Sequence, residues 1–98
     1  MGERIVLRPE LAAFAEEMER RLRRKDDVRG VSWRNEDDDW LLDRLHEEVE
    51  ELEVAMRRQD RSRDVRVIHE AADVANFALF LAAQAAAHIA EEEADRGR

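Results

Sequence analysis

Apolar residues recur at three- and four-residue steps in the first third of the chain, which is the spacing of one face of an α-helix. The stripe consists of Leu11, Phe14, Met18 and Leu22. Pro9 suits the first turn of such a helix, because its missing N–H would have no helical acceptor there. Gly30 interrupts the pattern. We therefore predict a first helix that begins near Pro9 and ends before Gly30.

A second stripe with the same spacing consists of Leu41, Leu45, Val49, Leu52 and Met56. Asn35 is a good N-cap for this helix, because its side-chain oxygen can accept hydrogen bonds from first-turn amides. The acidic residues 36–39 place negative charge at the positive end of the helix dipole. The polar residues 59–63 carry no stripe. The second helix is therefore predicted to begin after Asn35 and to end before residue 59.

The rest of the chain predicts a long third helix, capped by Ser62 or Asp64 and running to roughly Glu92. Residues 71–90 are apolar on nearly every side, which predicts burial between neighbouring helices or across a subunit interface. A membrane span is the alternative for such a segment. Polar side chains interrupt it, however, and alanine contributes little hydrophobicity, so we expect no membrane segment. The interrupting residues are Asp73, Asn76, Gln84 and His88.

The length and composition of the chain also indicate its fold class and its assembly. With 98 residues, no cysteine, one proline and three glycines, the chain is predicted to form a single all-α domain over residues 1–98. A chain of this length buries only about two-thirds of the surface that it exposes when unfolded, which leaves a monomer marginal. We therefore expect a bundle of three main helices per chain, completed by formation of a homodimer or a higher homo-oligomer.

The charge excludes one class of partner. The chain has 25 acidic and 17 basic residues and a formal net charge of −8, which repels phosphate backbones, so we expect no nucleic-acid binding. If the protein acts on phosphates, a cation must intervene. The lack of cysteine fits a reducing compartment, and the first residues have no apolar run of signal-peptide length, so we predict a cytoplasmic protein.

Two pairs of carboxylates stand beside the apolar stripes. Glu48 and Glu51 lie three residues apart in the second predicted helix, and Glu70 and Asp73 lie three residues apart in the third. Residues at this spacing share one face of a helix. A short polar loop joins the two helices, so an antiparallel hairpin would bring both pairs together. Each pair also has a simpler interpretation, as part of a solvated charged face.

Asp73 is the most informative of these residues, because apolar neighbours surround it in the sequence. A buried carboxylate persists only if it is paired or bound to a metal. Two explanations therefore stay open, a metal ion or an ion pair with one of the arginines between Arg57 and Arg66. Four oxygen ligands would suit Mg²⁺, with Mn²⁺ as a substitute. Zinc is less suited, because the three histidines lack the spacing of a histidine site.

These residues resemble the hallmark of the MazG-like nucleotide pyrophosphohydrolases of the small phage and bacterial type, within the all-α NTP pyrophosphatase superfamily. That hallmark is Glu-Glu-x-x-Glu followed by Glu-x-x-Asp. The matching residues are Glu47, Glu48 and Glu51, then Glu70 and Asp73, with Asn76 one turn later. The similarity extends upstream over Phe14, Met18, Leu22, Lys25 and Trp33. One departure concerns the residues after the last core helix, where many members hold the triphosphate with basic or amide groups, whereas this chain ends in Ala-Asp-Arg-Gly-Arg.

The resemblance implies Mg²⁺-dependent hydrolysis of a nucleoside triphosphate, in particular a deoxynucleotide, to the monophosphate and pyrophosphate, for housecleaning of the nucleotide pool. Phosphoribosyl-ATP pyrophosphohydrolase and dimeric dUTPase are substrate variants within the superfamily. The implied metal ligands are Glu48, Glu51, Glu70 and Asp73. The alternative is a non-catalytic helical dimer that acts as an interaction or regulatory protein and keeps the acidic motif for structure.

Further site residues are hypotheses that each have a structural alternative. Glu47 would orient or deprotonate the attacking water, or it is simply exposed to solvent. Asn76 would bind a sugar hydroxyl or a phosphate, or form a hydrogen bond within the bundle. Trp33 would stack on a base, or pack in the core. Lys25 and the arginines between Arg57 and Arg66 would bind phosphate, or remain solvated.

Overall fold

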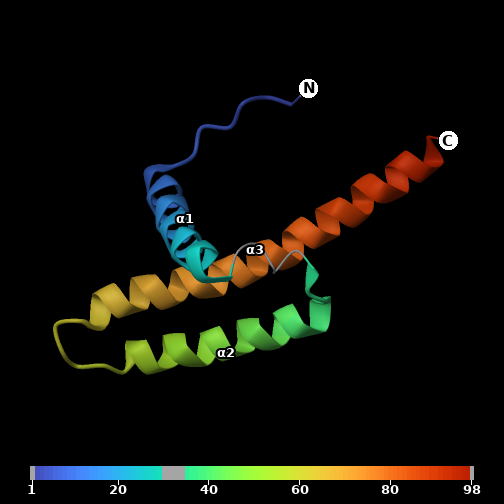
Figure 1. Ribbon diagram of the computed structural model, residues 1–98. Coiled ribbons are helices and arrows are strands. Elements are labelled where there is room, and N and C mark those ends of the chain that lie inside the picture. The colour runs from blue at the N-terminus through green and yellow to red at the C-terminus, as the bar shows by residue number, and fades with distance from the viewer. Residues whose placement is uncertain (1, 30–34, 98) are drawn as a thin grey trace.

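The computed structural model describes residues 2–29 and 35–97 and contains three α-helices, which are α1 (Pro9–Arg29), α2 (Asp38–Met56) and α3 (Arg63–Arg96). Helices α2 and α3 form an antiparallel hairpin, and α1 crosses α3 near its middle (Figure 1). No strand occurs in the described residues. The predicted all-α fold with three main helices is therefore confirmed.

The start of α2 differs from the prediction. Its N-cap is Asp37, whose carboxylate accepts a hydrogen bond from the backbone N–H of Trp40 at 2.8 Å. Asn35 lies two residues earlier and is exposed, so the prediction of an Asn35 cap was wrong. A carboxylate both accepts from the free first-turn amides and carries the negative charge that the helix dipole favours, which an amide side chain lacks.

The loop before α3 is organised around Asp60. Ser62 is the N-cap residue of α3, as predicted, but its side chain makes no capping hydrogen bond. Its hydroxyl donates instead to the carboxylate of Asp60 at 2.7 Å, and Arg58 donates to the same carboxylate at 2.8 Å. These hydrogen bonds, that of Ser62 first, lower the pKa of Asp60 to about 2. These hydrogen bonds stabilise the short loop that connects α2 to α3, and the two helices pack against each other.

The core is small and lies where the three helices meet. Leu41, Phe77 and Phe80 are buried in it, and the ring centroids of the two phenylalanines lie 5.3 Å apart in an edge-to-face arrangement. The leucines that pack against this core from each of the three helices are Leu22, Leu45 and Leu81. At the end of α2 the buried residue is Ala55, whereas Met56, which the stripe predicted to be buried, is 52% exposed.

The second half of α3 extends beyond the hairpin (Figure 1). Burial within the chain therefore covers mainly the part before residue 82, and large apolar residues further along, such as Ile89, are exposed. Helix α3 is long and apolar enough to cross a membrane, with a mean hydropathy of 1.3 in its most apolar window, of which 28% is buried. A single helix of this kind is weak evidence for a membrane segment, since the core helices of soluble proteins pass the same test.

Candidate metal centre

Three glutamates from two helices meet at the α2–α3 hairpin. Glu48 and Glu51 project from the same face of α2, as their spacing predicts, and Glu70 faces them from α3. One carboxylate oxygen of each lies within 4.8 Å of one oxygen of each of the others. Glu48 is buried, Glu70 is partly buried and Glu51 is exposed, so the group opens to solvent on one side. We call these three residues the glutamate cluster.

The electrostatics of the glutamate cluster are unfavourable without a cation. Burial, then hydrogen bonding and repulsion from Glu51, raise the pKa of Glu48 to about 7. The same causes in the same order raise the pKa of Glu70. Among the described residues, neither Glu48 Oε2 nor Glu70 Oε2 has a hydrogen-bond partner, although both atoms are buried. Orphaned carboxylate oxygens that converge in this way fit a hard divalent cation.

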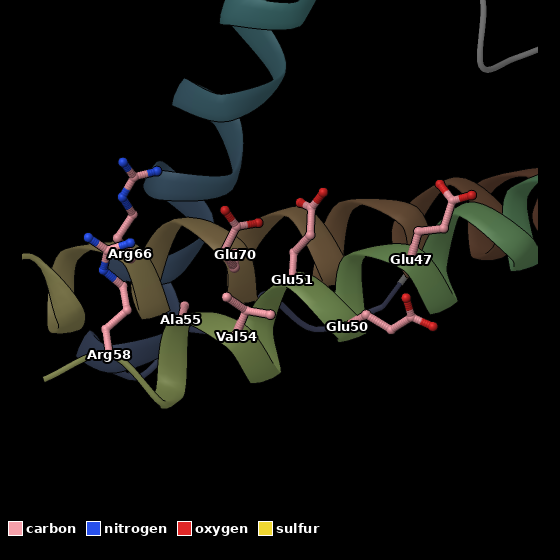
Figure 2. A pocket seen from close by; sticks show the side chains of 8 residues that line it. All are labelled: Glu47, Glu50, Glu51, Val54, Ala55, Arg58, Arg66 and Glu70. Carbon is pink, nitrogen blue, oxygen red and sulfur yellow. The ribbon is translucent and has the colours of Figure 1, made fainter.

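A cavity of about 480 Å³ adjoins the glutamate cluster. It is lined by Glu47, Glu50, Glu51, Val54, Ala55, Arg58, Arg66 and Glu70. Figure 2 shows the carboxylates of Glu51 and Glu70 side by side, with Glu47 further along α2 and the two arginines at the opposite end. A site of this kind offers acidic ligands for a cation and guanidinium groups for an anion within one cavity.

Asp73 lies outside the glutamate cluster and is held by α1. Arg21 donates from Nε to Asp73 Oδ1 at 3.1 Å and from Nη2 to Asp73 Oδ2 at 2.7 Å. Lys25 Nζ lies 3.7 Å from Asp73 Oδ1. The ion pair that the sequence left open as an alternative to a metal is thus present, but its partner comes from α1 and not from the arginines between Arg57 and Arg66.

Arg21 is the residue at this site that the sequence interpretation missed. It follows Phe14 by seven positions and Met18 by three, so it shares the face of α1 that packs on α3. A charged residue inside an apolar stripe was the signal that could have identified it, because such a residue needs a partner on the neighbouring helix.

Asn76 fastens α1 to α3 one turn beyond Asp73. Its side-chain Nδ2 donates to the backbone carbonyl of Met18 at 3.1 Å, and the residue is buried. Its Oδ1 is buried and has no partner among the described residues. The side-chain nitrogen of Asn76 therefore makes a hydrogen bond within the bundle, which was the alternative to substrate binding.

The other predicted site residues lie around the hairpin. Glu47 is exposed, lines the cavity and pairs with Arg44, which also lies 3.6 Å from Glu48 Oε1. Lys25 lies beside Asp73 with Nζ 5.5 Å from the centre of the Phe77 ring, on the α1 side of α3. Trp33 lies outside the described residues. The structure thus brings Glu47 to the cavity of the glutamate cluster and places Lys25 with Asp73.

Comparison with known proteins gives one match. The sequence profile of the phosphoribosyl-ATP pyrophosphohydrolase family matches residues 11–93, which include most of the three helices and all four carboxylates of the two predicted pairs. This family and MazG belong to the same all-α NTP pyrophosphatase superfamily. No curated protein and no solved structure matches the chain.

Proposed function

The chain belongs to the phosphoribosyl-ATP pyrophosphohydrolase family, and from this membership we infer that it hydrolyses the α–β phosphoanhydride bond of a nucleoside 5′-triphosphate, releasing a monophosphate and pyrophosphate. The observation that carries this proposal is the glutamate cluster, whose buried oxygens lack partners among the described residues beside an open cavity. Deoxynucleoside triphosphates and phosphoribosyl-ATP both carry such a triphosphate, so both are candidate substrates.

The glutamate cluster fits Mg²⁺, with Mn²⁺ as a substitute, since all its donors are carboxylate oxygens. Glu48, Glu51 and Glu70 would hold the ion. Bound there, it would offset the charge of the triphosphate, polarise the phosphoryl group and lower the pKa of a water molecule. In the absence of a cation the pKa of Glu48 is raised to about 7, and a bound cation would lower this pKa and so keep the carboxyl ionised.

The chain's own residues would position the substrate from the two ends of the cavity. Arg66 makes no ion pair within the described residues, and Arg58, which is paired with Asp60, lies at the same end of the cavity. We propose that these guanidinium groups hold the outer phosphates of the substrate. At the other end, Glu47 is exposed and would hold the attacking water by accepting its hydrogen bond.

A homodimer is the proposed assembly of this single domain. Several large apolar side chains of α2 and α3 are exposed in the isolated chain, and three of them, at 42–57% exposure, are proposed to lie in the interface. These are Leu42, Leu79 and Ile89. Burial of such side chains against a second copy would remove apolar surface from water and complete the bundle. This proposal also accounts for the long apolar α3 without a membrane, in keeping with a cytoplasmic protein.

The test is product analysis with Mg²⁺ and a panel of ribo- and deoxynucleoside triphosphates plus phosphoribosyl-ATP. The parent protein should release a monophosphate and pyrophosphate, and the Glu48→Gln variant should not. Glu53→Gln, an exposed change on the same helix outside the cavity, is the matched control and should keep full activity. Failure of every substrate to react would contradict the proposal and favour the non-catalytic helical dimer.

A further inference from the structure

A second cavity lies where α1 packs on α3, and it shares no lining residue with the cavity of the glutamate cluster. Its volume is about 440 Å³. It is lined by Glu17, Arg20, Arg21, Arg23, Arg24 and His69. We call this cavity the arginine pocket. Its lining is locally basic, with four arginines against one glutamate, on a chain whose formal net charge is −8.

The helix dipole does not account for these arginines. Cations stabilise a helix from its last turn, and the effect falls off beyond that turn. Helix α1 ends at Arg29, so its last turn begins near Asp26, after the arginines of the pocket. Arg20 and Arg24 stand instead four residues apart on one face of the helix, where two like charges repel each other. An anion bound between them would relieve this repulsion.

Three of the arginines are available to a ligand. Arg20 pairs with Glu17 at 3.2 Å, and its side chain is 62% exposed. Arg23 pairs with Glu19 at 3.6 Å, and its side chain is 76% exposed. Exposed ion pairs of this kind contribute little to stability, so another anion can replace them. Arg24 is exposed and makes no ion pair within the described residues.

The chemistry of these side chains indicates the ligand. A guanidinium group binds a phosphate through two parallel hydrogen bonds, so several of them together can hold more than one phosphate group. We propose that the arginine pocket binds a small anion with two or more linked phosphate groups through Arg20, Arg23 and Arg24, without a metal ion. Arg21 takes no part, since its guanidinium group is hydrogen-bonded to Asp73.

A small anion fits this pocket better than a nucleic acid does. A long phosphate backbone would extend from the pocket over the rest of an acidic protein, which repels it. A short chain of phosphates would stay inside the pocket, which His69 lines from the side of α3. The arginine pocket goes beyond the proposed function and does not depend on it, because binding there needs neither a metal ion nor hydrolysis.

The test is calorimetric titration of the full chain with inorganic pyrophosphate in a metal-depleted buffer of low ionic strength. The parent should bind pyrophosphate more tightly than inorganic phosphate, and added salt should weaken the binding. Arg24→Gln should weaken it about tenfold, the loss expected for hydrogen bonds between charged groups. Arg61→Gln is the matched control, because it removes the same charge from an exposed position that lines neither cavity. Its affinity should stay within about twofold of the parent value.

Two further arms locate the anion and identify its source. Arg66→Gln alters the cavity of the glutamate cluster and should bind pyrophosphate as the parent does in the metal-depleted buffer. Inorganic triphosphate and ATP are titrated in the same way. Equal affinities for these two would support recognition of the phosphate groups alone, and tighter binding of ATP would support a nucleotide as the source of the phosphates.

Three results would overturn the arginine pocket as a binding site for linked phosphates. They are no binding of pyrophosphate to the parent, equal affinities for phosphate and pyrophosphate, or a loss of affinity in Arg66→Gln that Arg24→Gln does not show. If Arg24→Gln fails to fold by circular dichroism, Arg23→Gln replaces it, with the same expected loss. Because every titration is carried out without Mg²⁺ and without turnover, these results leave the proposed hydrolysis to its own test.

Discussion

The carboxylates of Glu48 in α2 and Glu70 in α3 approach each other within 4.8 Å across the helix hairpin, although their positions in the sequence are far apart. Two like charges at this distance destabilise the folded protein unless one is protonated or a cation lies between them. The hairpin brings them together because the Asp60-centred loop is short and because the apolar faces of α2 and α3 pack on each other. The fold thus maintains a repulsive arrangement that a bound cation would relieve.

The first expected consequence is a pH dependence of stability. The pKa of Glu48 is raised from 4.5 to about 7 in the folded protein, mainly by burial. Between these values the folded state binds more protons than the unfolded state, so the free energy of unfolding falls as the pH rises through this window. At pH 8, Glu48→Gln should raise the Tm of the metal-free protein by about 4–8 °C, the shift that roughly 1 kcal/mol produces in a domain of this size.

The check is a series of thermal unfolding curves between pH 4 and pH 8 in a chelating buffer. The gain of Glu48→Gln over the parent should be largest at the high end of this range and should vanish near the low end. Glu53→Gln, on the exposed side of α2, should follow the parent at every pH. A Glu48→Gln curve parallel to that of the parent would show that Glu48 has no raised pKa.

A second expectation concerns metal addition. A ligand that binds only the folded state raises its stability by about 2.7 kcal/mol at a hundred times its Kd. Mn²⁺ or Mg²⁺ should therefore raise the Tm of the parent by roughly 10 °C or more. The shift should shrink sharply in Glu51→Gln, which removes one member of the glutamate cluster, and should persist in Glu50→Gln, which changes a neighbouring carboxylate of the cavity wall. Equal shifts in the two variants would argue for nonspecific binding to an acidic surface.

A third expectation tests the cap of α2. Asp37→Ala removes the acceptor of the Trp40 N–H hydrogen bond and should lower the free energy of unfolding by about 1 kcal/mol. Asn35→Ala is the paired control and should have almost no effect, because Asn35 lies before the cap and is exposed. Urea denaturation monitored by circular dichroism measures both. If Asn35→Ala lowers the free energy of unfolding more than Asp37→Ala does, then Asn35 is the N-cap of α2, as the sequence predicted.

A fourth expectation concerns the attachment of α1. Asn76→Ala removes the donor to the Met18 carbonyl and should lower the free energy of unfolding by about 1–3 kcal/mol, because a partly buried acceptor loses its partner. Hydrogen exchange should rise mainly in α1, since this contact is one of few that hold it to α3. The exposed amide of Gln59 offers a control, Gln59→Ala, which should change neither quantity. Loss of protection spread evenly over all helices would show that Asn76 supports the whole core and not α1 in particular.

The first two helices followed from the sequence because their 3.6-residue stripes of apolar side chains are long and separated by polar segments, and the third followed from its candidate caps and its long apolar run. Their ends were less well specified, because several acidic residues precede α2 and each can serve as a cap, so only the actual backbone geometry selects Asp37. A stripe also does not fix which residue of its last turn is buried, which is why Ala55 is buried where Met56 was predicted.

The sequence also predicted part of the acidic site, namely that Glu48, Glu51 and Glu70 lie close together. Spacing along α2 placed Glu48 and Glu51 on one face, and the short loop brought Glu70 to them. The position of Asp73 could not be deduced in the same way, because it depends on how α1 crosses α3. The spacing along a single helix does not predict that crossing, and the pairing of Asp73 with Arg21 is a tertiary contact between residues 52 positions apart in the sequence.

The last expectation concerns the outer face of α3. Ile89 lies in the last third of α3 and is 57% exposed, so only a contact with another molecule can bury it. Ile89→Asp would place a charge in the proposed homodimer interface and should turn a dimer into a monomer, as measured by size-exclusion chromatography with light scattering. Ile5→Asp introduces the same charge at an exposed isoleucine before α1 and should leave the dimer intact. A parent protein that is monomeric at micromolar concentration would contradict the homodimer and would leave the apolar face of α3 exposed to solvent.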